Sequence, residues 1–479
     1  MNKLVFVSFE KERLNVESAL QQFLITVNRP DYFDQLNYIV KELVTNAEKA
    51  NLKRIYFDNK GFDINNNDEY ENAIATFRND MLFNYDEYIE TAKSRGYYVE
   101  LLMSTVDRKM IIEVKNNSEL VKKEIERIKN KMQIAARFNS MEEVIQEVLD
   151  QTEGAGFGLI LSVLILRKLG VDENVINIGS KDSKTTFRIS LPIDLVNDKK
   201  GDVIAEEVVK AVDDIPQFPQ HFIEVINVLN KPDSTFEVIG TIAKKDPSFV
   251  AALLKTANSA IYSLPKKVEN INDAISLIGI NGVKNFVFTY STSKALMNKY
   301  NIDEITRMIT HAQEVTLYAA LLADKFKKRT LKDNLFVAGM LHDLGKIIIR
   351  GINQKLSDHI QQVCESKGIN NYIIESLTNG YNHAIIGAKL AEKWNFPDFL
   401  TESIQFHHIP LQASDKNIDL VSIVYLADII SYYKDAKYKF SEINMQVLKR
   451  FGINTKGDFD VLIKPFIEKY AETKENFLL

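Results

Sequence analysis

The sequence has a single cysteine, Cys364, among its 479 residues. One cysteine cannot form a disulfide within the chain, and it cannot supply the several thiolates of a structural zinc cluster. Long hydrophobic runs are also missing. No stretch reaches the roughly 18 apolar residues of a membrane-spanning helix, and charge comes too early at the N-terminus for a secretory signal. We therefore expect a cytoplasmic protein with no membrane-inserted segment.

An excess of either charge is missing as well. The chain carries 60 Lys and Arg against 65 Asp and Glu, a net charge of -5, and the two signs are interspersed along the sequence. Proteins that bind nucleic acid usually carry a basic patch or tail, and the composition gives no sign of one. Direct binding to nucleic acid is therefore not expected.

The chain does have enough apolar residues for more than one core. Hydrophobic residues make up 45% of it, with 27 Phe and 19 Tyr. Its length exceeds the roughly 250–300 residues beyond which a single core stops growing. A polar, charged segment at 197–202 marks a boundary. We predict a domain over residues 1–195, a linker over 196–214, a second domain over 215–435 and a C-terminal helical extension over 436–479.

The first domain mixes the periodicities of helices and strands. Helices are predicted at Leu36–Ala50 and Leu159–Leu169, and strands at Arg54–Phe57, Tyr97–Met103, Met110–Val114 and Thr186–Leu191. An α+β fold follows, with helices against one sheet. After Pro219 strand patterns almost vanish, so the second domain is predicted to be all-α.

Histidine is scarce, and five of the seven histidines lie in apolar helical segments of the second domain. These five are His311, His342, His383, His407 and His408. In the segment 339–346 (GMLHDLGK), His342 and Asp343 are predicted to lie about 100° apart on one helix, close enough to share a metal ion. Asp428 lies in another apolar helix, where an unpaired carboxylate is costly. All of these side chains need partners.

Together these seven side chains are a candidate metal site. Imidazole combined with carboxylate suits iron, manganese or another borderline-to-hard divalent ion better than it suits thiolate-type structural zinc. We predict one ion at His311, His342, Asp343 and Asp428, and a second at His383, His407 and His408. The alternative is that protein hydrogen bonds alone satisfy these groups, which would make the domain a structural scaffold.

Further segments of the second domain carry signatures that accompany this pattern. They are Asp246–Pro247 (DP), Asn258–Ala260 (NSA), Ala274–Gly279 (AISLIG), Asn382–Leu390, Trp394–Pro397 and Phe406–Pro410. With the His-Asp pattern they resemble the HDOD family, a branch of the His-Asp phosphohydrolase superfamily, over roughly Asp213 to Tyr432. The resemblance implies an all-helical domain that works in bacterial signal transduction through contacts with other signalling proteins.

The seven ligands also resemble those of the HD-GYP cyclic-di-GMP phosphodiesterases. For an enzyme of this kind, we expect Asp343 and Lys346 to be catalytic, with Lys346 stabilising the charge that develops on a phosphoryl group. The Gly-Tyr-Pro signature does not follow His407 and His408, however. This departure argues against hydrolysis of a cyclic dinucleotide.

Two short patterns in the first domain suit phosphate chemistry. Glu42 and Asn46 are four residues apart, hence on one helical face. Gly154, Gly156 and Gly158 precede an apolar helix, so backbone amides near its N-terminus have room to approach a phosphate. Each pattern alone is also typical of an ordinary solvated helix or turn.

In this order, and followed by the strand Thr185–Pro192, the two patterns resemble the histidine-kinase and gyrase-type (GHKL) ATPases. The resemblance covers about Leu36 to Pro192 and implies an ATPase-like sandwich. It also implies that Glu42 activates water, that Asn46 contacts magnesium and that the three glycines contact phosphate.

The adenine-reading Asp-x-Gly box of that family corresponds here to Asn116-Asn117-Ser118. An amide loses a charge-assisted hydrogen bond to the base, and a side chain in place of glycine crowds it. We therefore expect ATP and magnesium to bind weakly or not at all. The first histidine of the chain, His221, follows this module, which argues against a conventional sensor kinase.

Two function classes compete. One is a regulatory protein, in which the first domain reports on a ligand or partner and the HDOD-like domain relays that state to other signalling proteins. The other is a metal-dependent phosphohydrolase that acts on a nucleotide or cyclic dinucleotide under control of the first domain. The retained ligands favour the enzyme, and the missing Gly-Tyr-Pro signature favours the regulator.

Overall fold

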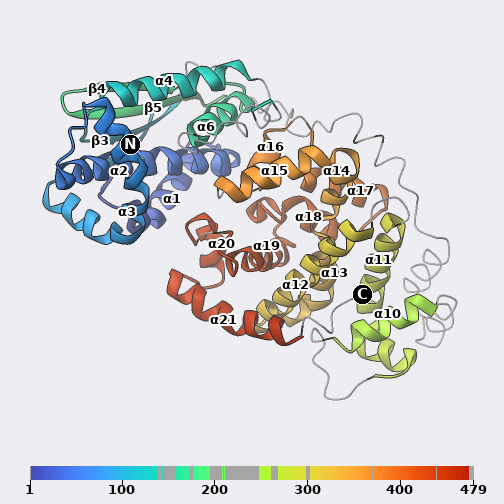
Figure 1. Cartoon of the computed structure of the whole chain (residues 1–479). Coiled ribbons are helices and arrows are strands. Elements are labelled where there is room, and N and C mark those ends of the chain that lie inside the picture. Colours follow the sequence, from blue (N-terminus) through green and yellow to red (C-terminus); the bar gives the residue numbers. More distant parts are fainter. Residues whose placement is uncertain are drawn as a thin grey trace. The chain divides into compact units, whose positions relative to one another are not determined.

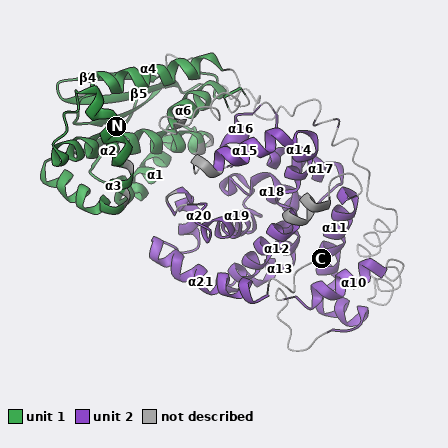
Figure 2. Ribbon diagram, viewed as in Figure 1, with its two compact units in different colours: residues 1–201 green, residues 202–479 purple. Residues whose placement is uncertain are grey.

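The chain forms two compact units in a computed structural model, residues 1–201 and residues 202–479 (Figures 1 and 2). The structure describes residues 2–138, 143–144, 157–171, 176–194, 208, 210, 247–259, 268–297, 302–367, 371–378, 380–438 and 440–473. Most of the predicted linker, the stretch up to Asp246 and the glycines Gly154 and Gly156 therefore lie outside the described residues.

Unit 1 combines one antiparallel sheet with helices, which confirms the predicted mixture of the two. Its sheet has the strand order β1-β2-β3-β5-β4, and every neighbouring pair is antiparallel. The strands are β1 (Asn2–Phe6), β2 (Val99–Val106), β3 (Lys109–Asn116), β4 (Ile176–Lys181) and β5 (Lys184–Pro192). The helices are α1 (Phe9–Thr26), η1 (Pro30–Tyr32), α2 (Phe33–Lys60), α3 (Asn67–Ser94), α4 (Lys122–Arg137) and α6 (Phe157–Lys168).

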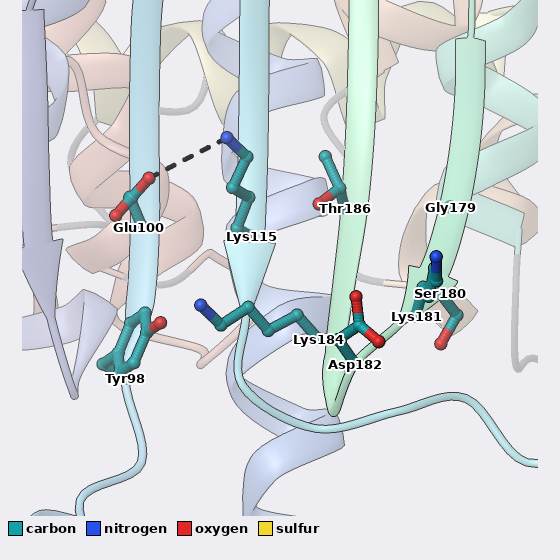
Figure 3. Close-up of a pocket in the computed structure, with 9 residues that line it drawn as sticks. All are labelled: Tyr98, Glu100, Lys115, Gly179, Ser180, Lys181, Asp182, Lys184 and Thr186. Carbon is teal, nitrogen blue, oxygen red and sulfur yellow. Dashed lines mark ion pairs between the residues drawn. The ribbon is translucent and has the colours of Figure 1, made fainter.

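The two faces of the sheet differ because side chains alternate along each strand. Leu101 and Val114, which are cross-strand partners, are both buried on the inner face, where α1 and α2 pack. The outer face carries charge: Glu113 pairs with Lys115 at 2.7 Å and with Arg188 at 3.6 Å. An open cavity of about 490 Å³ lies on this outer face (Figure 3). It is lined by Tyr98, Glu100, Lys115, Gly179, Ser180, Lys181, Asp182, Lys184 and Thr186.

The predicted strand Arg54–Phe57 is wrong, because these residues continue α2. Their β-branched and aromatic side chains favour a strand locally, but Leu52, Ile55 and Tyr56 are buried at the i, i+3, i+4 spacing of a helix. They join an aromatic cluster formed with α3. Tertiary burial therefore overrides the local preference.

A buried ion cluster ties the N-terminal turn of α4 to α2. The carboxylate of Glu124 lies 2.6 Å from Lys53 Nζ and 2.6 Å from Arg54 Nη2. Burial alone would raise the pKa of Glu124, but the hydrogen bond from Arg54 and the charge of Lys53 lower it to about 2. The carboxylate of Glu124 is therefore ionised in folded unit 1 at neutral pH.

Because its pKa is lower in the folded chain than the usual 4.5, Glu124 should stabilise unit 1 above pH 4.5. That contribution, about 3 kcal/mol, should be lost as the pH falls from 4.5 towards 2. Glu124→Gln should destabilise unit 1 by a similar amount at pH 7, because it leaves two partly buried cations without their counterion. Chemical denaturation at pH 7 and at pH 3 measures both effects. The exposed Glu126→Gln on the same helix is the control, and equal stability of the two variants at pH 7 would contradict the prediction.

Unit 2 is helical throughout the residues that the structure describes, as predicted. Its α-helices are α10 (Pro247–Ala257), α11 (Ile271–Met297), α12 (Ile302–Lys325), α13 (Lys332–Leu341), α14 (Leu344–Ile352), α15 (Gln354–Lys367), α16 (Asn371–Ser376), α17 (His383–Lys393), α18 (Asp398–Phe406), α19 (Ile418–Tyr433), α20 (Met445–Arg450) and α21 (Lys456–Thr473). Short 3₁₀ helices are η4 (Arg329–Leu331), η5 (Pro410–Gln412) and η6 (Phe440–Glu442).

The core of unit 2 is built around α19. This helix is buried on all sides from Leu420 to Ser431, and it packs against α12, α13 and α18. A helix that is apolar all round belongs in the interior of a bundle. In the described parts of the chain, no helix is long and apolar enough to cross a membrane.

Candidate metal centre

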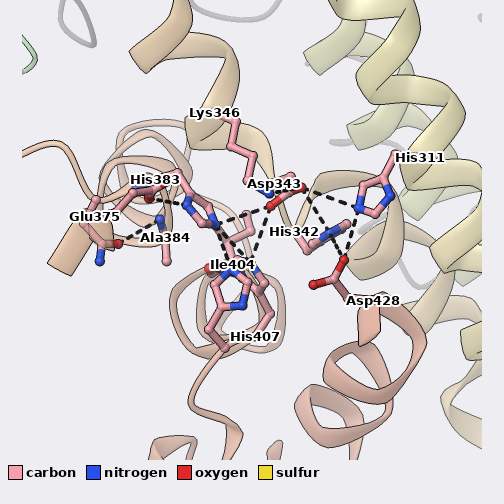
Figure 4. Close-up of polar contacts among 12 residues, drawn as sticks. His311, His342, Asp343, Lys346, Glu375, His383, Ala384, Ile404, His407 and Asp428 are labelled. Carbon is pink, nitrogen blue, oxygen red and sulfur yellow. Dashed lines mark hydrogen bonds and ion pairs between the residues drawn. The ribbon is translucent and has the colours of Figure 1, made fainter. Parts of the chain in front are cut away.

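The seven predicted ligands come from five places in unit 2 and converge. Figure 4 labels all of them except His408. His311 is on α12, Asp428 is on α19, and His383 is the first residue of α17. His342 and Asp343 lie between α13 and α14, and His407 and His408 directly follow α18. Most of the ligands therefore sit at helix ends, where the chain changes direction and a side chain can reach a shared centre.

The prediction that His342 and Asp343 lie within one helix is wrong. His342 is the residue that follows α13, and Asp343 precedes α14 with φ -95° and ψ 16°. The backbone carbonyl of Asp343 accepts the N–H of Lys346 at 2.9 Å, which starts the new helix. This junction lets the two neighbouring side chains face the same point.

Asp343 lies at the middle of the cluster and divides it in two. Its Oδ2 lies 3.6 Å from His311 Nε2 and 3.5 Å from His342 Nε2. Its Oδ1 lies 3.4 Å from His383 Nε2 and 3.5 Å from His407 Nε2. We call His311, His342, Asp343 and the adjacent Asp428 the first subsite. Asp343, His383, His407 and His408 form the second subsite.

Hydrogen bonds at the outer ring nitrogens determine which tautomer the histidines adopt. His342 Nδ1 lies 2.7 Å from Gly339 O, and His407 Nδ1 lies 2.8 Å from Ile404 O. A carbonyl oxygen can only accept, so both Nδ1 atoms carry a hydrogen. When these rings are neutral, each Nε2 is therefore a bare acceptor that points into the cluster.

These inward-pointing groups are suited to a cation. His342 Nε2 and Asp343 Oδ1 are buried and have no hydrogen-bond partner. His383 Nε2 and His407 Nε2 face each other at 3.2 Å. Lone pairs this close repel, and one proton satisfies only one such pair. Divalent ions in the two subsites would compensate all of them, so the residues present fit a metal centre.

The carboxylates of the cluster are ionised. Burial alone would raise the pKa of Asp343, but Lys346 and His342 hold that pKa well below its ordinary value. Burial alone would also raise the pKa of Asp428. A hydrogen bond from His311 outweighs the effect of burial and brings this pKa well below its ordinary value. Metal binding requires carboxylates in this ionised form.

Two of the second-subsite histidines are neutral. Burial, followed by the charge of Lys346, brings the pKa of His383 well below its ordinary value. Burial also lowers the pKa of His408, helped by His407 and His383. Neutral imidazole is the form that ligates a metal, so the electrostatics suit the predicted role.

Glycines let the backbones of two ligand-bearing helices, α14 and α17, come into direct contact. A Cβ on Gly345, in α14, would lie 1.9 Å from the carbonyl oxygen of His383. A Cβ on Gly387, in α17, would lie 3.0 Å from the backbone nitrogen of Gly345. The contact between α14 and α17 therefore depends on glycine, and it keeps Asp343 within reach of His383.

The predicted catalytic lysine adjoins the cluster. Lys346 Nζ lies 2.7 Å from Asp343 Oδ2, and its side chain keeps 21% of its surface exposed. The ring of Tyr432 lies 5.2 Å from that of His311, and the ring of Tyr372 lies 5.4 Å from that of His408. The sequence interpretation did not assign these two tyrosines to the site.

Glu375 was also missed. It is buried, and its Oε2 accepts the backbone N–H of His383 at 2.8 Å and contacts the Nδ1 of the same residue. Burial raises the pKa of Glu375 to about 7, although the His383 N–H opposes this shift. The available signal was a lone carboxylate in the apolar segment Tyr372–Leu377, where an unpaired charge is costly.

In unit 1 the structure brings together three of the five predicted nucleotide-site residues. Asn46 Nδ2 donates to Glu42 Oε1 at 2.9 Å on α2. Gly158, on α6, lies so near that an added Cβ would be 2.1 Å from the Glu42 carboxyl carbon. The carboxylate of Glu42 therefore lies directly against the first turn of α6.

Asn116, which the ATPase resemblance places at the adenine-reading position, forms hydrogen bonds inside the protein. Asn51 Nδ2 donates to Tyr98 O, so its Oδ1 is left to accept from Asn116 Nδ2 at 3.1 Å. Asn116 Nδ2 also lies 2.6 Å from Ser118 Oγ. Asn116 Oδ1 has no hydrogen-bond partner but is sealed from solvent, so a base cannot reach it without a rearrangement.

We therefore expect the full chain to bind ATP and magnesium with a Kd weaker than about 1 mM, because the Asn116 amide is already engaged. Isothermal calorimetry measures this directly. Low-micromolar binding that Asn46→Ala abolishes would show that the pocket still works.

The comparisons with known proteins agree with the helical half of this description. Residues 215–410 match the family model of the HDOD domain. The C-terminal region contains an HDOD domain. Asp428 lies beyond the matched residues, so α19 completes the cluster from outside them.

Relatives of the chain include an uncharacterized protein of Treponema pallidum (strain Nichols), 29% identical over 440 residues. That alignment covers 92% of this chain and 85% of the relative, so it must include most of both units. The similarity to that protein therefore extends over both units.

Among solved structures, an HDOD domain protein of unknown function from Geobacter sulfurreducens is 21% identical with a TM-score of 0.46. It covers 58% of this chain and 97% of its own. A second structure is that of a Shewanella amazonensis protein whose name describes it as a metal-dependent phosphohydrolase without demonstrated activity. It is 20% identical with a TM-score of 0.42. It covers 57% of this chain and 96% of its own. The ATPase-like fold predicted for unit 1 is not supported, and the described part of that unit is an antiparallel sheet with helices.

Proposed function

We propose that this chain is a signal-transduction protein whose HDOD domain holds a centre of two divalent metal ions. The observation that carries the proposal is the convergence of bare Nε2 atoms on the ionised carboxylate of Asp343. Hydrogen bonds within the protein leave His342 Nε2 and Asp343 Oδ1 without a partner. Since the ligands are nitrogen and oxygen atoms without thiolate, iron or manganese fits better than zinc.

Metal analysis of the purified full-length chain, prepared without chelator, tests the centre. Inductively coupled plasma mass spectrometry should find up to two ions of iron or manganese per chain. A chain that is isolated metal-free, and that remains so when Mn²⁺ or Fe²⁺ is added, would refute the centre and support the scaffold alternative.

The relay requires that the state of the metal centre reaches a surface that other signalling proteins can contact. Hydrogen exchange of the full chain with and without metal tests this. We expect protection to change on α15 or α21 or in unit 1, as well as on the helices that carry ligands. Changes confined to α12, α13, α14, α17, α18 and α19 would indicate a purely structural ion.

A metal-dependent phosphohydrolase is the second candidate, and Lys346 favours it. Its ammonium group lies beside Asp343 and is partly exposed, so a phosphoryl group at the centre could reach it. A bound divalent ion would lower the pKa of water and polarise the phosphoryl oxygen. Asp343 would hold the two subsites together, and Lys346 would stabilise the charge that develops on the phosphoryl group.

If the chain is such an enzyme, Mn²⁺-loaded protein should hydrolyse bis(p-nitrophenyl) phosphate or a nucleotide. Lys346→Ala should then lower kcat by about 10²- to 10³-fold, because a preorganised charge is lost. The exposed Lys389→Ala on α17 is the control. Absence of turnover in metal-loaded wild type would leave the regulatory role as the function of the site.

For unit 1 we propose a sensory role toward a ligand or partner, with a nucleotide as one candidate ligand. The proposal rests on Glu42, Asn46 and Gly158 lying together at the start of α6. A cytoplasmic location and contacts with other signalling proteins complete the proposal, since both suit a regulatory protein.

A further inference from the structure

Glu375 stands apart from the other groups that hold the metal-site histidines. The outer nitrogens of His342 and His407 are held by backbone carbonyls. That of His383 is held by a carboxylate, and the same oxygen also accepts the backbone N–H of His383. One buried side chain on α16 therefore fixes both the ring and the main chain of a single ligand.

His383 is in turn the central ligand of the second subsite. Its Nε2 lies 3.0 Å from His408 Nε2, 3.2 Å from His407 Nε2 and 3.4 Å from Asp343 Oδ1. A rotation of the His383 ring would move Nε2 away from all three of these atoms. His311 and His342 do not depend on it, because they face the other oxygen of Asp343.

We propose that Glu375 is a positioning residue that controls loading of the second subsite independently of the first. The inference rests on the proposed metal centre. A carboxylate that accepts from Nδ1 holds the ring with Nε2 free to ligate, and when it is ionised its negative charge makes the imidazole a stronger donor. Loss of such a partner typically weakens metal affinity by 10- to 100-fold. The effect should fall on the second ion alone.

A structural role for Glu375 is the competing explanation. Its carboxylate accepts the N–H of the first residue of α17, so it also anchors α16 to the start of that helix. The two roles differ in what a Glu375→Gln substitution does. The glutamine side chain would keep an acceptor for the anchor but would lack the charge that strengthens His383 as a ligand.

Titration of the full-length, metal-free chain with Mn²⁺, followed by calorimetry and electron paramagnetic resonance, separates the possibilities. Wild type should bind two ions and show the spectrum of a coupled pair. Glu375→Ala should bind the first ion with unchanged affinity and the second about 100-fold more weakly, so that the spectrum of an isolated ion persists. Glu375→Gln should weaken the second ion by about 10-fold. Thermal unfolding of the metal-free variants monitors the structural role separately.

The exposed Glu392→Gln on α17 is the matched control and should behave as wild type. Second-ion affinity unchanged in Glu375→Gln, or both ions weakened equally, would overturn the proposal. Glu375→Gln decides the matter even if the alanine variant fails to fold. A wild-type chain that binds no ion refutes the metal centre itself, whereas two ions bound with wild-type affinity in every variant refute only the role of Glu375.

Discussion

Replacing Asp343 with alanine is expected to remove both metal ions at once. Its two oxygens face different subsites, so one substitution deletes a ligand from each. In wild type, metal at a thousandfold excess over its Kd should stabilise the fold by about 4 kcal/mol. Asp343→Ala should show no rise in Tm when Mn²⁺ is added and no bound metal by mass spectrometry.

The exposed Asp358→Ala in the same domain is the control, because Asp358 is not among the candidate ligands and its carboxylate pairs with Arg350 on α14. It should retain both ions and the metal-dependent rise in Tm. Retention of one ion with wild-type affinity by Asp343→Ala would show that Asp343 serves a single subsite and does not bridge.

Gly345→Ala is expected to have a comparably large effect without replacing any ligand. The added methyl group would lie 1.9 Å from His383 O, and a backbone oxygen cannot swing aside as a flexible side chain does. α14 must then move away from α17, at a cost of about 3 kcal/mol or more in unfolding free energy. Asp343 would separate from His383, so the second ion should be lost in preference to the first.

Gly457→Ala is the matched control for that substitution. Gly457 is exposed in the first turn of α21, and its nearest neighbour to an added Cβ is Thr455 Oγ1 at 3.7 Å. Alanine there should stabilise the helix by about 0.5–1 kcal/mol and leave metal binding unchanged. Denaturation and metal titration of both variants give the comparison, and a Gly345→Ala chain with normal stability and two ions would contradict the packing argument.

Much of the candidate site was accessible from residue types. Histidines are scarce in the chain, so five of them in apolar helical segments required a common explanation. The structure brings those five together with Asp343 and Asp428, and their binding of metal stays a prediction. The division into two subsites was not accessible in detail, because it depends on which oxygen of Asp343 faces which ring.

Glu375 shows why supporting residues are harder to find than ligands. It is eight residues before His383, on a different helix, and its partner is set by how α16 lies against α17. Spacing along the chain carries no information about such a contact. The same holds for Gly345, whose conformation is ordinary and whose importance comes only from the neighbour it touches.

The sequence by itself determined the broad architecture, because hydrophobic periodicity reports local secondary structure. The strand pair β2 and β3, the strand β5 and the apolar helix α6 were all predicted near their observed positions, as was the change to helices in unit 2. Only the tertiary structure decided that Arg54–Phe57 continues a helix, that His342 and Asp343 lie at a helix junction, and that Glu375 supports His383. Burial against α3 decides the first case and a hydrogen bond to a different helix decides the last, and such partners exist only once the helices have packed.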